Sequence, residues 1–477
     1  MIISNGVCTF RTCLRLPEIP LLRPSPPPLS FSNLRRRFLA TSVNAATRNK
    51  EKVIVISGPT GSGKSRLALE LAKRLNGEIV SADSVQVYRG LDIGSAKPSP
   101  TERKEVPHHL IDILHPSEGV FPSVHFFITP IKTDYYLSDY SVGQFFEDAR
   151  QATRCILDNG RVPIVVGGTG LYLRWFIYGK PDVPKASPEV TSEVYLELAE
   201  LQRNEDWDAA VQLVVKAGDP KAQFLKLNDW YRLRRSLEVI KSSGSPPSAF
   251  RVPYDSFREK GDCSDADVSE SSEVNTYGDA MEETNSADLD YEFMCFFLSN
   301  QRVDLYRAID YRCEDMLMGR DGILSEAQWL LNIGLLPNCN SATRAIGYRQ
   351  GMEYLLRCRE QGGQSSVGEF HKFLSEFRKA SRNFAKRQLT WFRNESIYHW
   401  LDASKPLETV LNFIHDAYRD QSGSIAVPEN LRMARDISNG REASLLKSYR
   451  TQNRHFVNRD DCSPILDWIS ESQKLKA

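Results

Sequence analysis

One stretch decides the fold: Val53-Ile54-Val55-Ile56, then Ser57-Gly58-Pro59-Thr60-Gly61-Ser62-Gly63-Lys64-Ser65, then Arg66-Leu67-Ala68-Leu69-Glu70-Leu71-Ala72-Lys73. The first run is β-branched and apolar, which is typical of a buried parallel strand. The last run has apolar residues at helical spacing. Between them, Gly58 to Ser65 matches the pattern G-x4-G-K-[ST] in the strand-to-helix context that the pattern requires. The stretch therefore predicts a phosphate-binding loop in an α/β fold.

The residue types of this loop suit a polyphosphate. Glycines let backbone N–H groups turn toward a phosphate, and the N-terminus of the following helix adds a favourable dipole. Lys64 supplies a point charge, and Ser65 can bind Mg2+, the cofactor that the sequence predicts. We therefore expect diphosphate binding by Gly58, Pro59, Thr60, Gly61, Ser62, Gly63, Lys64 and Ser65.

The acidic residue of a typical nucleotide hydrolase is not evident. Such enzymes hold Mg2+ with an aspartate at the end of a second apolar strand. The apolar run at 162–166 ends instead in Gly167-Gly168-Thr169-Gly170, whereas Asp83 does end a strand candidate, at 78–83. Its position alone leaves Asp83 open as a metal ligand, a helix cap or a base. A kinase stays possible, and a molecular switch is disfavoured.

Strands alternate with helical patterns in the first part of the chain. This order predicts an α/β fold, a P-loop core with a parallel β-sheet flanked by helices, together with a helical insertion and a helical C-terminal part. The composition is globular, with 41% of 477 residues hydrophobic and 61 basic residues balancing 61 acidic ones. No run approaches 18 apolar residues, so no membrane span is expected. Nine scattered cysteines disfavour a disulfide framework and a local zinc site.

Composition also divides the chain into segments. Residues 1–50 are Arg-rich and acid-poor, so we expect a disordered leader that serves as a transit peptide to the plastid, with cytoplasm or mitochondrion as alternative locations. The remaining boundaries are a catalytic core at 51–186, a helical region at 187–250, a disordered acidic insertion at 258–290, the rest of the core at 291–417 and a polar tail at 418–477.

Further stretches, in order along the chain, resemble the tRNA dimethylallyltransferase (isopentenyltransferase) family. They are Ser81 to Pro98, Pro107 to Asp112, Val166 to Tyr172, Asn228 to Val239, Arg344 to Gln350 and Lys386 to Arg393. The similarity spans about 52–402. With its leader, the chain resembles a bacterial-type member of this family from a plant.

The resemblance implies transfer of a dimethylallyl group from dimethylallyl diphosphate to the exocyclic amine of a tRNA adenosine. The implied target is adenosine 37, in tRNAs reading codons that begin with U, and in plants such tRNA feeds cis-zeatin cytokinins. Asp83 is then the general base for the amine. By the same resemblance Thr169 and Arg344 join the loop in stabilising the leaving diphosphate. The alternatives are a helix N-cap for Thr169 and a structural salt bridge for Arg344.

The expected partner is the anticodon stem-loop of a tRNA, bound by a monomer. The target base must leave its stack, and RNA loops are recognised by phosphate contacts and stacking. Basic and aromatic residues alternate at 226–235 and at 377–393, which suits an RNA surface, with a solvated helix face as the alternative. The second cluster includes Arg378 and Arg382. The expected tRNA-binding residues are Ser84, Val85, Gln86, Val87, Tyr88, Arg232, Arg235, Lys386, Arg387 and Gln388.

Residues 119–138 depart from the family pattern, because they insert an apolar and almost uncharged segment. We interpret it as sequence read through an unspliced intron, with a lid element as the alternative. Two competing functions stay open beside the tRNA prenyltransferase. One is an adenylate isopentenyltransferase acting on free AMP, ADP or ATP, which needs no anticodon-loop surface. The other is a nucleotide-gated RNA-binding module, which needs no carboxylate at Asp83.

Overall fold

The computed structural model describes residues 50–118, 140–250, 252–253, 289–421, 423–435 and 440–474. The expected leader, the insertion at 119–138 and nearly all of the acidic insertion at 258–290 therefore lie outside the described residues. Everything described belongs to one unit, Lys50–Ala477.

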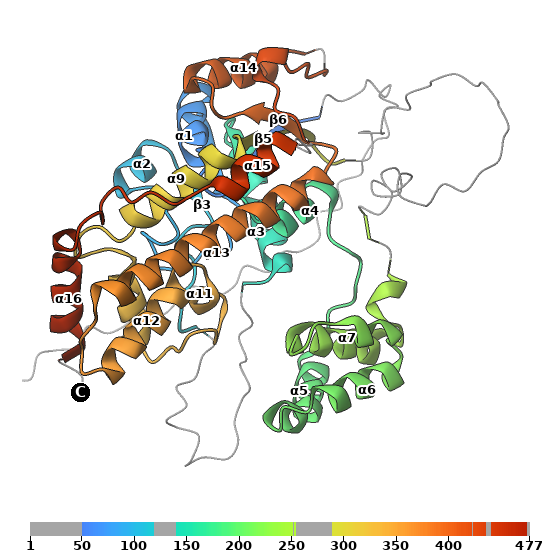
Figure 1. Cartoon of the computed structure of the whole chain (residues 1–477). Coiled ribbons are helices and arrows are strands. Elements are labelled where there is room, and N and C mark those ends of the chain that lie inside the picture. The colour runs from blue at the N-terminus through green and yellow to red at the C-terminus, as the bar shows by residue number, and fades with distance from the viewer. Residues whose placement is uncertain are drawn as a thin grey trace, which may run out of the picture. The chain divides into compact units, whose positions relative to one another are not determined.

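A parallel β-sheet organises the described residues (Figure 1). Its six strands are β1 (Lys52–Ser57), β2 (Gly77–Ser81), β3 (His108–His109), β4 (Val162–Val166), β5 (Glu292–Ser299) and β6 (His399–Asp402). The order across the sheet is β3-β2-β4-β1-β5-β6, and each neighbouring pair is parallel. In the central strand, Ile54 lies level with Ile164 of β4 and Met294 of β5. The strand that carries the phosphate loop is thus enclosed on both edges.

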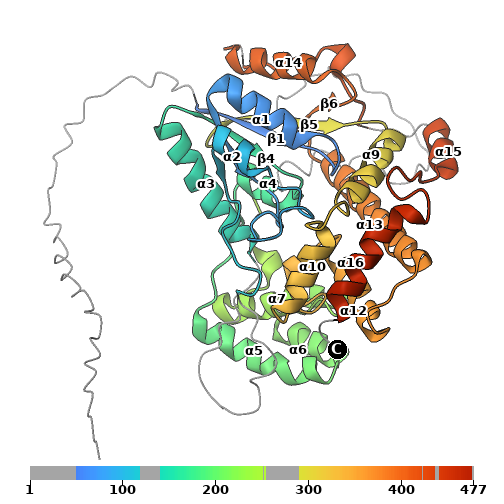
Figure 2. The ribbon, with the colours of Figure 1, turned by 90° about the vertical axis from the view of Figure 1, so that its left-hand side faces the viewer.

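Both faces of the sheet are buried, which explains the continuous apolar run of β1. Val53 and Val55 face one core, and Ile54 and Ile56 face the other. Helices α1 (Lys64–Leu75) and α14 (Leu407–Arg419) cover the second face (Figure 2). Helices α3 (Val142–Asp158), α4 (Gly170–Tyr178) and α13 (Val367–Arg393) cover the first. The expected α/β class, with a parallel sheet between helices, is confirmed.

The remaining helices extend the first core or stand apart from it. Those around the first core are α9 (Arg302–Asp315), α10 (Ile323–Asn332), α11 (Ser341–Arg344) and α12 (Tyr348–Glu360), and α2 (Pro100–Glu105) precedes β3. The helical insertion at 187–250 forms α5 (Pro188–Arg203), α6 (Trp207–Ala217) and α7 (Trp230–Ser243), with 3-10 turns at Pro220–Phe224 and Pro247–Ala249. These three helices share a separate small core that includes Val194, Val214 and Leu237. The helical character expected at 187–243 is therefore confirmed.

The polar tail at 418–477, in which the sequence assigned no elements, contains helices. The chain forms α15 (Gly440–Ser448) and α16 (Ser463–Lys474), and 3-10 turns at Glu429–Leu431 and Asp460–Cys462. Phe456, Cys462 and Ile469 are buried in the first core. In α16 the apolar residues Ile465, Leu466, Trp468 and Ile469 stand at helical spacing and pack at this core. No helix among the described residues is long and apolar enough to cross a membrane.

A buried ion pair joins α4 to the end of α13. Arg174 donates from Nε to Glu395 Oε1 at 2.7 Å, and both side chains are buried. The Arg174 guanidinium also lies over the Trp391 ring, 4.1 Å from its centroid. Because α4 follows the β4 loop, this pair links that loop to α13.

Removing one partner of this pair should be costly, because it leaves a buried charge without its counter-ion. We expect Glu395→Ala to lower the free energy of unfolding by about 3–5 kcal/mol, measured by urea denaturation. The matched control is Asp304→Ala, which breaks the exposed pair between Asp304 and Arg307 and should change stability by less than about 0.5 kcal/mol. Equal losses in the two variants would contradict the assignment.

Candidate active site

Three loops meet at the carboxyl edge of the sheet, because β2, β4 and β1 are parallel neighbours. Asp83 follows β2, Thr169 follows β4 and the phosphate loop follows β1. Backbone hydrogen bonds join them, from Ala82 N to Val166 O at 2.7 Å and from Gly167 N to Ile56 O at 3.2 Å. The carboxyl edge of a parallel sheet is where ligands of open α/β folds bind.

The phosphate loop adopts a conformation that requires glycine. Gly61 and Gly63 have φ values of 83° and 86°, in the left-handed region. A Cβ on Gly58 would lie 2.4 Å from the carbonyl oxygen of Leu298, at the end of β5. Helix α1 begins at Lys64 and has no side-chain cap at its N-cap residue, Gly63. Its first-turn amides are thus available to an anion, as a diphosphate site requires.

Lys64 is held inside this loop and is electrostatically poised for an anion. Its Nζ donates to the carbonyl oxygen of Pro59 at 2.8 Å. Burial, and to a lesser degree the nearby Arg312 charge, lower the pKa of Lys64 to about 7, while Asp83 acts in the opposite direction. The charge of Lys64 is therefore only partly present near neutral pH until an anion restores it.

Arg312 on α9 is a site residue that the sequence interpretation missed. Its charge acts on Lys64 and is itself influenced by Asp83, and burial lowers its pKa. Ile309, on the same helix, is packed so closely that a Cβ on Gly61 would lie 3.1 Å from its Cγ1. No motif marks Arg312, because its role depends on how α9 packs against the loop.

Arg344 is placed differently from Arg312. It is exposed at the C-terminal end of α11, where Nη2 donates to Ser341 Oγ at 3.5 Å. The expected contact of Arg344 with diphosphate stays a prediction from resemblance.

Asp83 and Thr169 are oriented by the same short turn. Asp83 Oδ1 accepts hydrogen bonds from the backbone N–H groups of Val85 at 2.8 Å and Gln86 at 3.3 Å. The Thr169 hydroxyl accepts one from Ser84 N at 3.3 Å. Thr169 is the N-cap residue of α4, as the alternative expected, but its side chain makes no cap hydrogen bond to the helix. The turn holds a carboxylate and a hydroxyl beside the phosphate loop.

The structure corrects the expected role of Gln388. Its side chain is only 6% exposed, and both ends of its amide bind the loops. Thr60 N donates to Oε1 at 2.9 Å, and Nε2 donates to the carbonyl oxygen of Gly168 at 3.0 Å. Gln388 thus connects two loops of the site and is too buried to bind RNA through its amide.

Two of the residues expected around a flipped base are also corrected. Val87 and Tyr88 are buried in the first core, so their side chains do not line a surface pocket. Ser84, Val85 and Gln86 are half-buried next to Asp83. The Gln86 amide accepts from Ser81 Oγ at 2.8 Å and donates to Ser95 O at 3.2 Å. The turn that follows Asp83 is therefore tied to the loop around residue 95.

Glu326 of α10 anchors that loop and was also missed. Its Oε1 accepts from the backbone N–H groups of Asp92 and Ile93, each at 2.7 Å. Its Oε2 accepts from Gly94 N at 3.0 Å and from the Tyr348 hydroxyl at 2.7 Å. One carboxylate thus holds three consecutive amides, an arrangement that no local sequence pattern reveals.

The basic residues of the cluster at 377–393 differ in accessibility. Lys386 and Arg387 are exposed on α13 and line a shallow pocket of about 470 Å3 together with Asn383, Thr390, Trp391 and Asn394. Arg378 and Arg382 point the other way and pair with Glu314 and Asp310, so they are not part of an RNA surface.

On α7, Arg232 is well exposed and lies 3.5 Å from Asp229, while Arg235 is half-buried and pairs with Glu238 at 3.2 Å. Both arginines lie on a helix that also exposes Tyr231. A role of these residues in binding tRNA stays a prediction.

The described residues could bind a Mg2+ ion only together with a phosphate that supplies some of its ligands. Within the ranges described above, no group of three or more His, Cys, Asp or Glu side chains is placed to hold a metal ion. Ser65 is exposed in the first turn of α1, next to Lys64. A Mg2+ ion bound here would take the Ser65 hydroxyl and phosphate oxygens, as such loops provide.

Diphosphate binding should depend on pH through Lys64. Because the pKa of Lys64 is lowered to about 7, a bound anion must raise it, so binding above pH 7 takes up about one proton per site. Below pH 7 Lys64 is already protonated, and the uptake fades. Calorimetric titration of inorganic diphosphate at pH 8, in buffers of different ionisation enthalpy, measures this uptake.

The control is Lys64→Arg, because a guanidinium stays charged throughout this range. It should lack the proton uptake of the unmodified protein, apart from the part that comes from diphosphate itself. Identical uptake in the two proteins would exclude Lys64 as the titrating group.

Comparison with known proteins gives a consistent result. A family model described as IPP transferase matches residues 86–134 and 124–395, two stretches that overlap inside 119–138. The chain is 59% identical to tRNA dimethylallyltransferase 9 of Arabidopsis thaliana, over 100% of this chain and 98% of that protein. It is 35% identical to a tRNA dimethylallyltransferase of Protochlamydia amoebophila, over 74% of this chain and 85% of that protein.

Among solved structures, a eukaryotic dimethylallyltransferase acting on tRNA matches with a TM-score of 0.53 and 22% identity, over 77% of this chain and 80% of that one. This likeness shows a shared fold. Taken with the family model and the full-length relative, it leads to one conclusion: the chain belongs to the IPP transferase family.

Proposed function

We propose that the protein transfers the dimethylallyl group of dimethylallyl diphosphate to the exocyclic amine of an adenosine in tRNA. The observation that carries this proposal is the junction of three loops at one sheet edge. An anion-binding loop, the Asp83 carboxylate and the Thr169 hydroxyl lie within a single hydrogen-bonded unit. Prenyl transfer needs a diphosphate site next to a base, and this junction provides both.

At the acceptor, Asp83 takes the proton. The lone pair of an adenine amine is delocalised into the ring, so the amine is a weak nucleophile that gains from a general base. In the described residues both backbone donors reach Oδ1 of Asp83, which leaves Oδ2 for the amine proton. As the new C–N bond forms, the C–O bond to diphosphate breaks, the amine proton passes to Asp83 and the electron pair leaves with the diphosphate.

At the donor, fixed positive charge receives the leaving group. Lys64, Arg312 and the amides of the phosphate loop lie together before any ligand binds, so little reorganisation is needed as charge develops on the diphosphate. The Thr169 hydroxyl bonds to Ser84 N beside Asp83, and its loop bonds to the end of β1, so in this proposal it contacts the oxygen at the breaking bond. Mg2+ held by Ser65 would neutralise further charge on the diphosphate.

Transfer to free AMP, ADP or ATP by an adenylate isopentenyltransferase is not favoured. The relatives at 59% and 35% identity are both named for action on tRNA. Exposed Lys386, Arg387 and Arg232 also suit phosphate contacts along an RNA. The tRNA anticodon stem-loop is the proposed partner and adenosine 37 the proposed target, and in a plant the product would supply cis-zeatin. A plastid location is part of the same proposal.

The activity is tested by incubating the chain with labelled dimethylallyl diphosphate, Mg2+ and either unmodified tRNA or AMP. We expect label in tRNA and none in AMP. Asp83→Asn keeps the side-chain shape and an acceptor for the turn, so it should lower kcat about 10²–10⁴-fold while inorganic diphosphate binds as before. Label in AMP alone would assign the adenylate activity, and label in neither substrate would overturn the proposal.

Glu326 should affect the acceptor side and leave the donor side unchanged. Glu326→Ala frees three backbone amides in the loop tied to Asp83, so we expect the KM for tRNA to rise about tenfold. Binding of inorganic diphosphate should not change. Glu326→Gln keeps the bonds to Oε1 and loses the acceptor for Gly94, so its effect should be smaller.

The control for this series is the neighbouring Ser325→Ala, which leaves the loop amides bonded. If Glu326→Ala weakened the binding of inorganic diphosphate as much as it raised the KM for tRNA, a role of Glu326 confined to the acceptor side would be contradicted.

A further inference from the structure

The segment Tyr449–Phe456, here called the C-terminal strap, lies beyond residue 395, where the family match ends. Figure 2 shows the chain between α15 and α16 passing beside α9 and α13. The strap ends in Phe456, which is 3% exposed and packs edge-on against Phe370 of α13 with ring centroids 4.9 Å apart. Phe456 therefore anchors the strap to the core, while the Tyr449 and Thr451 side chains and the backbone at Arg454 and His455 contact α9.

The first half of the strap completes a buried carboxylate on α9. Asp310 is 1% exposed and ion-paired through Oδ1 with Arg382 of α13. Its other oxygen, Oδ2, accepts from the Tyr449 hydroxyl at 2.8 Å and from Thr451 Oγ1 at 2.9 Å. A buried carboxylate is tolerated only when its lone pairs are used, and two of these donors come from the strap.

The second half repeats this arrangement one helical turn later. Glu314 is fully buried and ion-paired with Arg378 of α13. The backbone N–H of Arg454 donates to Glu314 at 3.0 Å, and that of His455 donates to the same carboxylate. Asn453 accepts from Arg378 Nη1 at 2.9 Å, so the strap binds both members of the pair.

The position of these carboxylates on α9 gives the strap a mechanistic meaning. Residues four apart share a helix face, so Asp310 and Glu314 lie one above the other. Arg312 is two residues from each, which places it on the opposite side of the helix. That side faces the phosphate loop, because the Arg312 charge acts on Lys64 and Ile309 packs against Gly61. The strap therefore binds the face of α9 that carries Asp310 and Glu314, while Arg312 lies on the opposite face, toward the phosphate loop.

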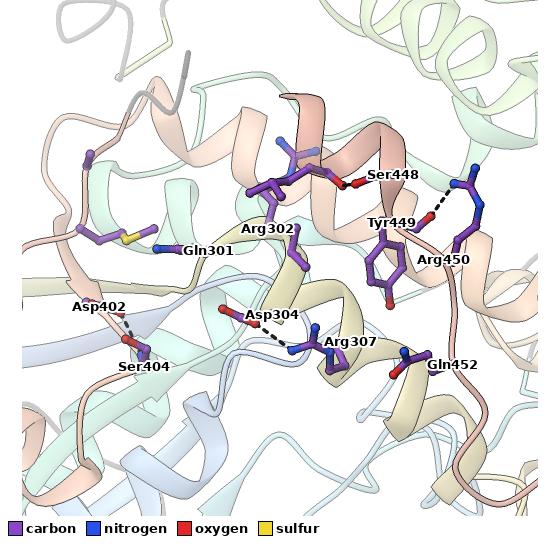
Figure 3. A pocket seen from close by; sticks show the side chains of 14 residues that line it. Gln301, Arg302, Asp304, Arg307, Asp402, Ser404, Ser448, Tyr449, Arg450 and Gln452 are labelled. Carbon is purple, nitrogen blue, oxygen red and sulfur yellow. Dashed lines mark hydrogen bonds and ion pairs between the residues drawn. The ribbon is translucent and has the colours of Figure 1, made fainter. Parts of the chain in front are cut away.

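On this side α9 is held by its two ion pairs with α13 and by the strap. A cavity of about 930 Å3 lies beside the strap. It is lined by Arg302, Asp304 and Arg307 of α9 and, across from them, by residues that include Asp402 of β6, Leu445 of α15 and Tyr449 and Gln452 of the strap. Figure 3 looks into this cavity, with Tyr449 across from Asp304 and Arg307. Because packed side chains do not fill this space, the hydrogen bonds from the strap add to the two ion pairs with α13 in fixing the helix there.

We propose that the C-terminal strap is a positioning element of the active site, which holds α9 through Asp310 and Glu314 and thereby sets Arg312 against the phosphate loop. The proposal rests on the proposed function, in which Arg312 stabilises the leaving diphosphate. Tyr449 and Thr451 are thus positioning residues that act through Arg312. They need not contact substrate.

The test is a double-mutant cycle on the full chain. The strap variant carries Tyr449→Phe and Thr451→Val, which removes both donors to Asp310 and conserves shape. We expect it to lower kcat for prenyl transfer to tRNA about 10–100-fold, with the KM for tRNA unchanged. In an Arg312→Lys background the same two substitutions should lower kcat less than about twofold, because their effect passes through Arg312.

Controls separate positioning from folding. Ser448→Ala removes a hydroxyl that donates within α15, to Leu445 O at 2.9 Å, and should leave kcat unchanged. Tyr449→Phe alone keeps the ring against Tyr306 and should give a smaller loss of kcat in the same direction, even where the double variant folds poorly. Thermal unfolding of each variant shows that the folded protein is being assayed.

The outcomes are distinct. A loss of kcat on the native background, together with a change of less than about twofold on the Arg312→Lys background, supports the strap as a positioning element. Equal fold-losses on both backgrounds, or full activity of a folded strap variant, would overturn it. Absence of labelled tRNA with the unmodified chain would instead refute the proposed function.

Discussion

The close approach of backbone segments at the carboxyl edge of the sheet is the constraint on which the site depends. A Cβ on Gly167 would lie 2.1 Å from the carbonyl oxygen of Ala82, and one on Gly58 would lie 2.4 Å from that of Leu298. Only glycine permits this spacing, so the loops after β1, β2 and β4 can bond directly to one another. A phosphate loop, a carboxylate and a hydroxyl are thereby brought within reach of one substrate.

This junction concentrates positive charge before any substrate is present. Lys64 and Arg312 are half-buried, the Arg312 charge acts on Lys64, and desolvation lowers the pKa of both. Such crowding disfavours the empty site, and a diphosphate relieves it by supplying the counter-charge. The same arrangement that costs stability in the free protein therefore favours binding and then stabilises charge on the leaving group.

Helix α13 connects this chemistry with the rest of the molecule. Gln388 bonds to the loops at Thr60 and Gly168. Trp391 packs directly against Gly170, so that a Cβ on this glycine would lie 2.3 Å from the Trp391 Nε1. One face of the helix presents Lys386 and Arg387 to solvent. Another presents Arg378 and Arg382 to the carboxylates of α9. One rigid element thus joins the diphosphate loop, a basic surface and the C-terminal strap.

The sequence by itself determined the phosphate loop and the α/β class, because these depend on local spacing between a strand, a turn and a helix. Its resemblance to a known family also indicated the family and singled out Asp83 and Thr169, whose roles stay predictions. Only the tertiary structure decided which charged residues face the site and which form ion pairs inside the fold. Arg378, Arg382 and Gln388 lie on the same helix as Lys386, yet packing of α13 buries Arg378 and Gln388, half-buries Arg382 and exposes Lys386. Arg312 gains its place from α9, and the C-terminal strap from contacts with residues more than a hundred positions earlier. Periodicity records which residues share a face of one helix, but the neighbour that meets this face is a property of the folded chain.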